Sequence, residues 1–143
     1  METRRVVVTG AGALTPIGNN LESYWQALKN GVSGAAPITY FDTTNFKTKF
    51  ACELKNFEAT DFLERKESRR LDKFSQYALV VAQEAYQDAN IKEEKINPER
   101  AGVIWGSGIG GMHTFFTESV NFAQGSGTPR FNPFFIPKLI SDI

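Results

Sequence analysis

The chain has 143 residues, 41% of them hydrophobic and 22% charged, and its 16 basic and 16 acidic side chains cancel. This balance is typical of one globular domain or a large piece of one, and it excludes an overall field that would favour nucleic acid or a membrane surface. The chain has one cysteine, Cys52, which excludes a disulfide within the chain and favours a reducing, cytoplasmic location. It also has one histidine, His113, so we predict no metal site.

The first residues predict a buried strand followed by a capped helix. The β-branched run at residues 6–8 ends in glycines, which is typical of a strand inside a parallel or mixed sheet. Asn20 can cap a helix over residues 21–29, with Trp25 and Leu28 on its inward face. The apolar run is too short for a signal peptide, and no run in the chain reaches the roughly 20 residues of a membrane span.

The middle of the chain predicts a loop, a short strand and the clearest helix. Residues 32–47 are loop-like, and residues 50–54 alternate weakly as in a short strand. After Asp72, apolar side chains recur every three or four residues up to a stop at Asn90, which predicts an amphipathic helix. Its inward positions are Phe74, Tyr77, Ala78, Val81, Ala82, Ala85 and Ala89.

The last third predicts a second strand and a second long helix around a glycine-rich turn. Residues 101–105 have the character of a buried strand, and a helix is expected over residues 112–123. Residues 131–137 form an aromatic run bounded by prolines, and Pro137 suits the first turn of a helix. The alternation of strand and helix indicates an α/β fold.

The turn Gly106-x-Gly108-x-x-Gly111 matches the dinucleotide-binding pattern and lies between a predicted strand and a predicted helix. That pattern also requires an acidic residue about 20 positions further on to hold the ribose, and this chain has Phe131 and Asn132 there. A nucleotide-binding module built on residues 106–111 is therefore a minor alternative.

Several short segments, in order along the whole chain, resemble the β-ketoacyl-[acyl carrier protein] synthases of the type II kind. The segments are Arg4-Arg5-Val6-Val7-Val8-Thr9-Gly10, Leu14-Thr15-Pro16-Ile17-Gly18, Phe41-Asp42, Thr48-Lys49-Phe50-Ala51, Arg65-Lys66-Glu67, Asp72-Lys73-Phe74, Gln76-Tyr77-Ala78, Gly106-Ser107-Gly108-Ile109-Gly110-Gly111 and Pro133-Phe134-Phe135-Ile136-Pro137. The resemblance implies a thiolase-like αβαβα layered fold, of which residues 1–143 would be the first part of the N-terminal half.

The resemblance also implies an activity: decarboxylative condensation of an acyl group, held on a cysteine, with malonyl-acyl carrier protein during fatty-acid elongation. The family uses a cysteine and two histidines, needs no cofactor and forms a homodimer. Cys52 lies in Phe-Ala-Cys-Glu, outside the family's catalytic context, and His113 does not match a family histidine. The resemblance thus implies that the chain stops before the catalytic cysteine and is inactive alone.

Two groups of residues acquire roles through the resemblance. Lys66, Arg69 and Arg70 would bind the acidic acyl carrier protein, and if the segment is one helix they share a face with Lys73. From charge alone, the same run could be an ordinary solvated helix face. Ile109, Phe135 and Ile136 would line the acyl pocket, although an aromatic core within the chain also explains the phenylalanine. A noncatalytic ketosynthase-like subunit of the chain-length-factor type remains an alternative to the enzyme.

Overall fold

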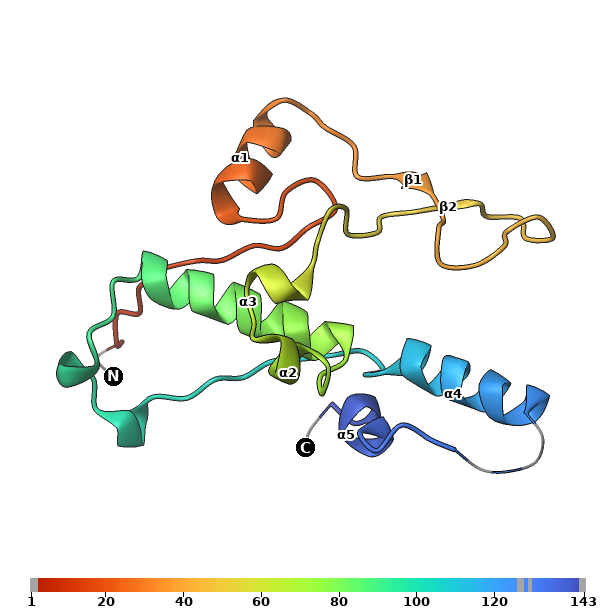
Figure 1. The fold of residues 1–143 in the computed structure, drawn as a ribbon. Helices are drawn as coiled ribbons and strands as arrows, with labels where there is room; N and C mark the ends of the chain where they lie inside the picture. Colours follow the sequence, from red (N-terminus) through yellow and green to blue (C-terminus); the bar gives the residue numbers. More distant parts are fainter. Residues whose placement is uncertain (1–2, 126–127, 129, 142–143) are drawn as a thin grey trace. The chain divides into compact units, whose positions relative to one another are not determined.

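The computed structural model of the chain describes residues 3–125, 128 and 130–141. They form two compact units, one built from residues 3–57 and 81–96 and the other from residues 58–80 and 97–141. The elements labelled in Figure 1, with the three 3-10 turns η1 to η3, are α1 (Leu21–Lys29), β1 (Ala36–Pro37), β2 (Phe50–Ala51), η1 (Ala59–Asp61), α2 (Arg65–Ser68), α3 (Lys73–Asp88), η2 (Glu93–Lys95), η3 (Pro98–Arg100), α4 (Met112–Gln124) and α5 (Phe135–Leu139).

In the first unit, α1 confirms the predicted capped helix. The Asn20 side chain accepts a hydrogen bond from the Ser23 amide at 2.8 Å, and the Ser23 hydroxyl accepts one from the Asn20 amide, which completes a capping box. The predicted inward face was wrong, because Trp25 and Leu28 are 55% and 44% exposed. Tyr24 is half-buried instead, because the loop before the helix packs on it. Gly18 in this loop lies so close to the Tyr24 backbone that a side chain at residue 18 would not fit.

The second half of α3 is covered by the extended segment at residues 10–13. A Cβ atom added to Gly10 would lie 2.4 Å from the Ala89 amide nitrogen, and one added to Gly12 would lie 2.3 Å from the Val81 carbonyl oxygen. The side of α3 that bears Val81 and Ala85, together with Ala89 just after the helix, therefore packs closely on a glycine-rich segment. Asn90, the predicted stop, has a φ of +48° just after the helix ends.

The only strands in the described part of the chain are β1 and β2, which pair antiparallel with Ala36 opposite Ala51. The strand predicted at residues 50–54 is confirmed for its first two residues only. The prediction of a continuous loop over residues 32–47 was wrong at β1.

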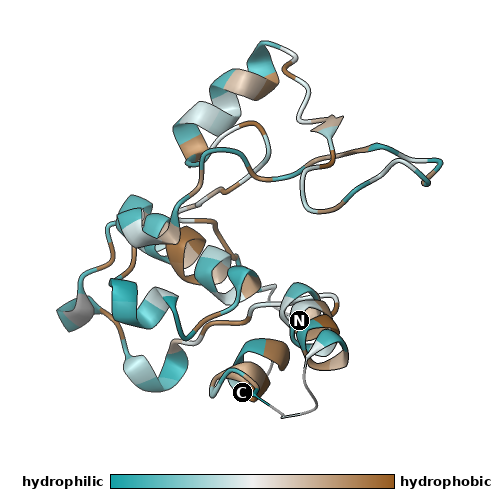
Figure 2. Ribbon diagram, turned by 45° about the vertical axis from the view of Figure 1, so that its right-hand side comes forward, coloured by the Kyte–Doolittle hydropathy of each residue, from teal (hydrophilic) through white to brown (hydrophobic). Residues whose placement is uncertain are grey.

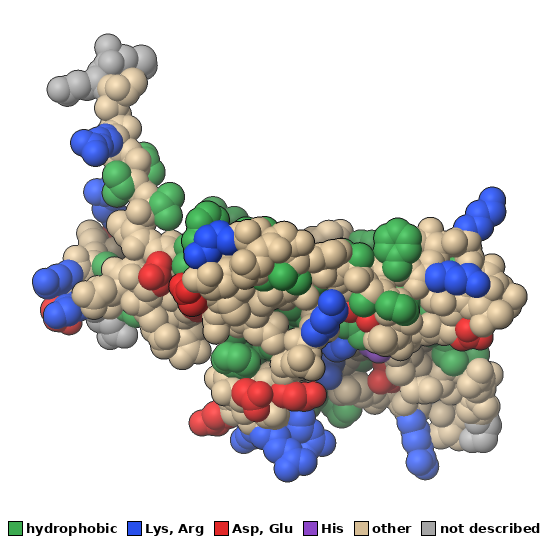
Figure 3. All heavy atoms as spheres, turned by 90° about the horizontal axis from the view of Figure 1, so that it is seen from above, with side chains coloured by type: hydrophobic (Ala, Val, Ile, Leu, Met, Phe, Trp, Pro, Cys, Tyr) green, Lys and Arg blue, Asp and Glu red, His purple; other side chains and the backbone are tan. Residues whose placement is uncertain are grey.

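The two buried strands predicted at residues 6–8 and 101–105 are not formed. Neither segment makes a strand ladder with other described residues, and Val6 and Ile104 are 89% and 101% exposed. Both predictions were wrong for the same reason: a strand is stabilised by a neighbouring strand, and the described residues provide none for these segments. Figure 2 shows brown, hydrophobic stretches of the chain outside the helices, and Figure 3 shows green hydrophobic side chains on the face that it presents.

In the second unit, α4 confirms the helix predicted over residues 112–123, and α5 contains Pro137 in its first turn. The two helices pack against each other (Figure 1), and a series of stacked rings joins them. Phe135 stacks on Phe115 and on Phe131, with ring centroids 6.5 and 5.6 Å apart, and Phe131 stacks on Phe122 at 5.5 Å. Among the described residues, no helix has the length and apolar character required to cross a membrane.

Candidate functional site

The predicted basic run lies on and just after the short helix α2. The Gln76 side chain donates to the Ser68 carbonyl at 2.8 Å and to the Leu71 carbonyl at 3.3 Å, which ties the end of α2 to α3. Ser68 is buried by this arrangement, whereas Lys66, Arg69 and Arg70 are exposed. The segment is not one helix, because α2 ends at Ser68 and Lys73 begins α3, so the condition for a shared face that includes Lys73 is not met.

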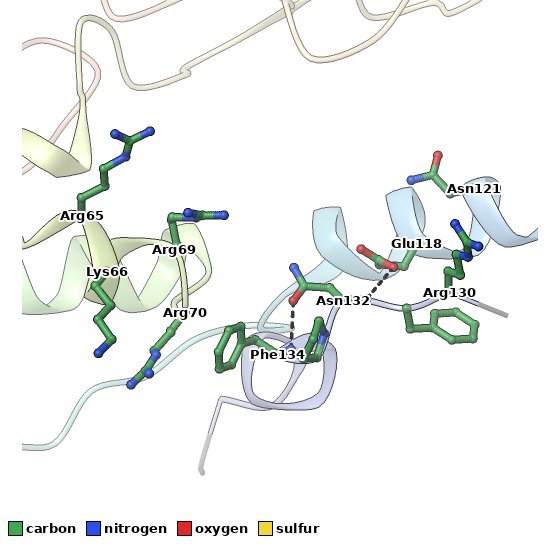
Figure 4. A pocket seen from close by; sticks show the side chains of 11 residues that line it. Arg65, Lys66, Arg69, Arg70, Glu118, Asn121, Arg130, Asn132 and Phe134 are labelled. Carbon is green, nitrogen blue, oxygen red and sulfur yellow. Dashed lines mark hydrogen bonds between the residues drawn. The ribbon is translucent and has the colours of Figure 1, made fainter.

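These cations form one wall of an open pocket of about 1040 Å³ within the second unit. In Figure 4 they lie on one side, and side chains from α4 and from the segment before α5 lie on the other. The lining residues are Arg65, Lys66, Arg69, Arg70, Glu118, Asn121, Arg130, Phe131, Asn132, Pro133 and Phe134.

Hydrogen bonds fix the second wall. The Asn132 amide donates to the Glu118 carboxylate at 3.2 Å, and the Asn132 side-chain oxygen accepts from the Phe134 amide at 2.9 Å. The guanidinium of Arg70 lies over the Phe134 ring, 5.4 Å from its centroid, in a cation–π contact. Arg70 therefore belongs to the basic wall of the pocket and contacts Phe134 in the opposite wall.

The pocket has a strongly positive lining. Five of its side chains are cationic and one, Glu118, is anionic, and that carboxylate already accepts a backbone hydrogen bond. Arg65, Lys66 and Arg69 make no ion pair with any carboxylate in the described part of the chain. The exposed guanidinium and ammonium groups are thus available to an acidic ligand or protein, and their attraction for it would weaken as salt increases.

Asn121, Arg130 and Asn132 line the pocket but were not predicted as site residues from the sequence. They are far from the basic run in the sequence: Asn121 follows Arg70 by 51 residues, and Asn132 follows Arg65 by 67. No local sequence pattern therefore connects them with the basic run. The only sequence signal was the position of Arg130 directly before the aromatic run.

The glycine turn packs against α5 through its backbone. The Gly111 amide donates to the Leu139 carbonyl at 3.0 Å, and the Gly111 Cα approaches α5 so closely that an added Cβ atom would lie 2.2 Å from the Lys138 oxygen. This amide begins α4 and is one of those that a dinucleotide phosphate would need. Because the Gly111 amide already donates to the Leu139 carbonyl of α5, it is not available to a phosphate, which disfavours the nucleotide-binding alternative.

The three predicted acyl-pocket residues do not line the basic pocket. Ile109 and Ile136 are 69% and 51% exposed, and Phe135 is half-buried in the ring series described above. The structure connects the loop that bears Ile109 to the helix that bears Phe135 and Ile136 through the Gly111–Leu139 bond. Their role as pocket residues stays a prediction.

Cys52 and His113 lie outside the residues that line the pocket. Cys52 follows β2 and is exposed, and His113 is exposed in the first turn of α4. Within the described ranges, no group of three or more histidine, cysteine, aspartate or glutamate side chains could hold a metal ion.

The chain is similar in structure and in sequence to known condensing enzymes. A solved structure described as the ishigamide ketosynthase/chain length factor superposes with a TM-score of 0.84 and 31% identity over 96% of this chain and 34% of its own. The fold is therefore part of a thiolase-like condensing-enzyme fold, as predicted. Residues 3–143 match the family model of the β-ketoacyl synthase N-terminal domain, and the chain belongs to this family.

Curated relatives agree with this assignment. The chain is 42% identical over its whole length to 3-oxoacyl-[acyl-carrier-protein] synthase 2 of Synechocystis sp., and 44% identical over 142 residues to the protein of the same name from Staphylococcus aureus strain COL. In both comparisons the chain spans about a third (34%) of the relative's length.

Proposed function

We propose that this chain is the N-terminal portion of a 3-oxoacyl-[acyl carrier protein] synthase that elongates fatty acids. In the proposed reaction, malonyl-carrier protein loses CO₂, and the resulting carbanion attacks the thioester carbonyl of an acyl group held on the enzyme. A carbon–carbon bond forms and the cysteine thiolate leaves. The cysteine and histidines of this chemistry lie outside residues 1–143, so this segment alone is inactive. The reaction needs no cofactor, and the complete enzyme is a cytoplasmic homodimer.

The observation that carries the proposal is the convergence of five cations at one pocket. Acyl carrier proteins are strongly acidic, and the names of the two curated relatives state that they act on acyl carrier protein. Lys66, Arg69 and Arg70 dock the carrier protein in this proposal, and Arg130 extends the surface from the opposite wall. Surface charges of this kind mainly accelerate and orient association.

Ile109, Phe135 and Ile136 belong to the acyl pocket in this proposal. The exposed Ile109 and Ile136 side chains would be covered by acyl chain, by further parts of the synthase and by the second subunit. One methylene in such a pocket is worth roughly 1–3 kcal/mol, which is enough to set a preference for chain length.

The test is a double charge reversal, Arg69→Glu with Arg70→Glu, in a full-length synthase that carries this segment. Each exposed ion pair contributes about 0.2–1 kcal/mol, so replacing two attractions by two repulsions should raise the KM for acyl-carrier protein about tenfold at low salt. The KM for an acyl-pantetheine surrogate, which has no carrier protein, should not change.

A matched control reverses two exposed lysines outside the pocket, Lys47→Glu with Lys49→Glu. This variant has the same change in net charge and should alter the KM less than twofold. An unchanged KM at low salt in the arginine variant, or an equal rise in the lysine variant, would contradict docking at this pocket.

A noncatalytic subunit of the chain-length-factor type is the second candidate, because the similar solved structure is described as a ketosynthase/chain length factor and so names both kinds of subunit. The two candidates differ in whether the complete protein has the catalytic cysteine. Stoichiometric labelling of the full-length protein with a radioactive acyl thioester would identify the enzyme.

A further inference from the structure

The turn between residues 106 and 111 has an open half and a clamped half. A Cβ atom added to Gly106 or Gly108 would have no heavy atom within 4 Å. By contrast, one added to Gly110 would lie 2.4 Å from the Leu139 carbonyl oxygen, and Gly110 has a φ of +77° that side chains rarely adopt. The clamped half is therefore held in place by α5, and the open half has no such support.

A single side chain connects the two halves. The Gly110 amide donates a hydrogen bond to the Ser107 hydroxyl oxygen at 3.1 Å, and Ser107 is half-buried although its neighbours in the open half are exposed. Among the described residues, no other hydrogen bond ties residues 106–109 to the rest of the molecule. Ile109 lies inside the turn that this bond closes.

We infer that Ser107 is a positioning residue that sets acyl-chain selectivity, because its hydroxyl fixes the turn that presents Ile109. The inference rests on the proposed function, in which Ile109 lines the acyl pocket. It adds that the pocket boundary depends on a hydroxyl that need not touch the acyl chain.

The physical reason is the conformational freedom of glycine. Ordering one residue costs roughly 1–2 kcal/mol of entropy, and glycine loses the most freedom of all residues. Without the Ser107 bond, the open half can sample other conformations while α5 still holds Gly110 and Gly111. The Ile109 side chain would then occupy several positions, so the pocket would distinguish less sharply between acyl chains that differ by two carbons.

The experiment compares Ser107→Ala, Ser107→Thr and Ser107→Cys in a full-length synthase that carries this segment. The readout is the ratio of kcat/KM for the longest acyl chain that is accepted well to that for a chain two carbons longer. A net hydrogen bond corresponds to a factor of about three to ten, and this ratio should fall by that factor in Ser107→Ala. Ser107→Thr keeps the hydroxyl and should retain the ratio of the parent enzyme.

The cysteine side chain has nearly the volume of serine, but its sulfur is a poor hydrogen-bond acceptor. Ser107→Cys should therefore show the same fall in the ratio as is expected for Ser107→Ala, and it provides the measurement if the alanine variant does not fold. Ser33→Ala is the matched control, since it removes a similar bond from the Ala35 amide, at 3.3 Å, in the other unit. It should leave the ratio unchanged. Hydrogen exchange of the Gly110 amide gives a second readout and should accelerate about three- to tenfold in the alanine and cysteine variants only.

Ile109→Phe separates the inference from the proposed function. If it cuts activity on long chains while folded Ser107→Ala and Ser107→Cys keep the parent ratio, the positioning role is overturned and the acyl-pocket proposal stands. If Ile109→Phe reduces activity equally on long and short chains, Ile109 does not line the pocket, and both fail.

Discussion

The first unit should depend strongly on Glu84, because its carboxylate joins two separate backbone segments to α3. One oxygen accepts from the Ala13 amide at 2.7 Å, and the other accepts from the Leu21 amide at 2.6 Å. Leu21 is the first residue of α1, so the same charge also lies at the positive end of that helix. Glu84→Gln keeps the shape of the side chain and replaces one acceptor with a donor.

The expected loss follows from these contacts. The substitution removes one charge-assisted hydrogen bond, worth about 1.5–3 kcal/mol, and turns an NH₂ group toward a backbone N–H. Loss of the charge at the helix terminus adds about 0.3–1 kcal/mol. The total, about 2–4 kcal/mol, should lower protection of the Ala13 and Leu21 amides against hydrogen exchange by roughly 30- to 1000-fold.

Hydrogen exchange in a full-length synthase that carries this segment measures this loss directly. Glu22→Gln is the control, because Glu22 has the same charge in the first turn of α1 but, among the residues that the structure describes, accepts only from the exposed Gln26 side chain, at 2.7 Å. It should cost no more than about 0.5 kcal/mol. Equal effects of the two substitutions would show that helix electrostatics, and not the bridge between segments, explains the role of Glu84.

Three further predictions concern reactivity, titration and solubility. Purified material of residues 1–143 should not decarboxylate malonyl thioester above background, and a rate that survives Cys52→Ala would refute the proposed location of the catalytic groups. Hydrogen bonds from the Thr44 hydroxyl, at 2.6 Å, and the Thr44 amide, at 2.9 Å, hold the pKa of Asp42 below its usual 3.8. The two hydrogen bonds stabilise the fold at pH values above the usual pKa, and this stabilisation is lost as the pH falls through the lowered pKa of Asp42. Because Thr44→Val removes the hydroxyl donor, it should raise the pKa of Asp42 in an NMR titration. The separate segment should self-associate through its exposed valine and isoleucine runs, and Ile104→Lys should make it more soluble in light scattering but lower the melting temperature of the full-length synthase.

The helices could be predicted from the sequence because their signals are local. Asn20 and Ser23 form the capping box of α1 within four residues, and the spacing of apolar residues after Asp72 places α3 within one residue of its observed start. Which face of α1 is buried was harder to predict. Trp25 is the larger side chain, but the loop at Gly18 packs on Tyr24, and that approach depends on residues outside the helix.

The strands could not be predicted in the same way, because a strand needs a partner that the local pattern does not specify. Val6 and Ile104 have the side chains of buried strands and yet are almost fully exposed in this chain. The similar condensing enzymes are about three times longer, and further strands in a complete synthase could cover these runs. The valines are therefore better evidence for the fold of the family than for the arrangement of this segment alone.

The candidate site divides along the same line. The basic pocket depends on contacts that residues 58–80 and 97–141 make among themselves, such as Gln76 with Ser68 and Glu118 with Asn132, so its cations converge in the chain as it stands. The proposed acyl pocket differs, because Ile109 and Ile136 remain exposed and need additional walls. Docking and chain-length selection should therefore be separable: charge reversal at Arg69 and Arg70 should change the KM for carrier protein without changing selectivity, and Ser107 variants should do the opposite.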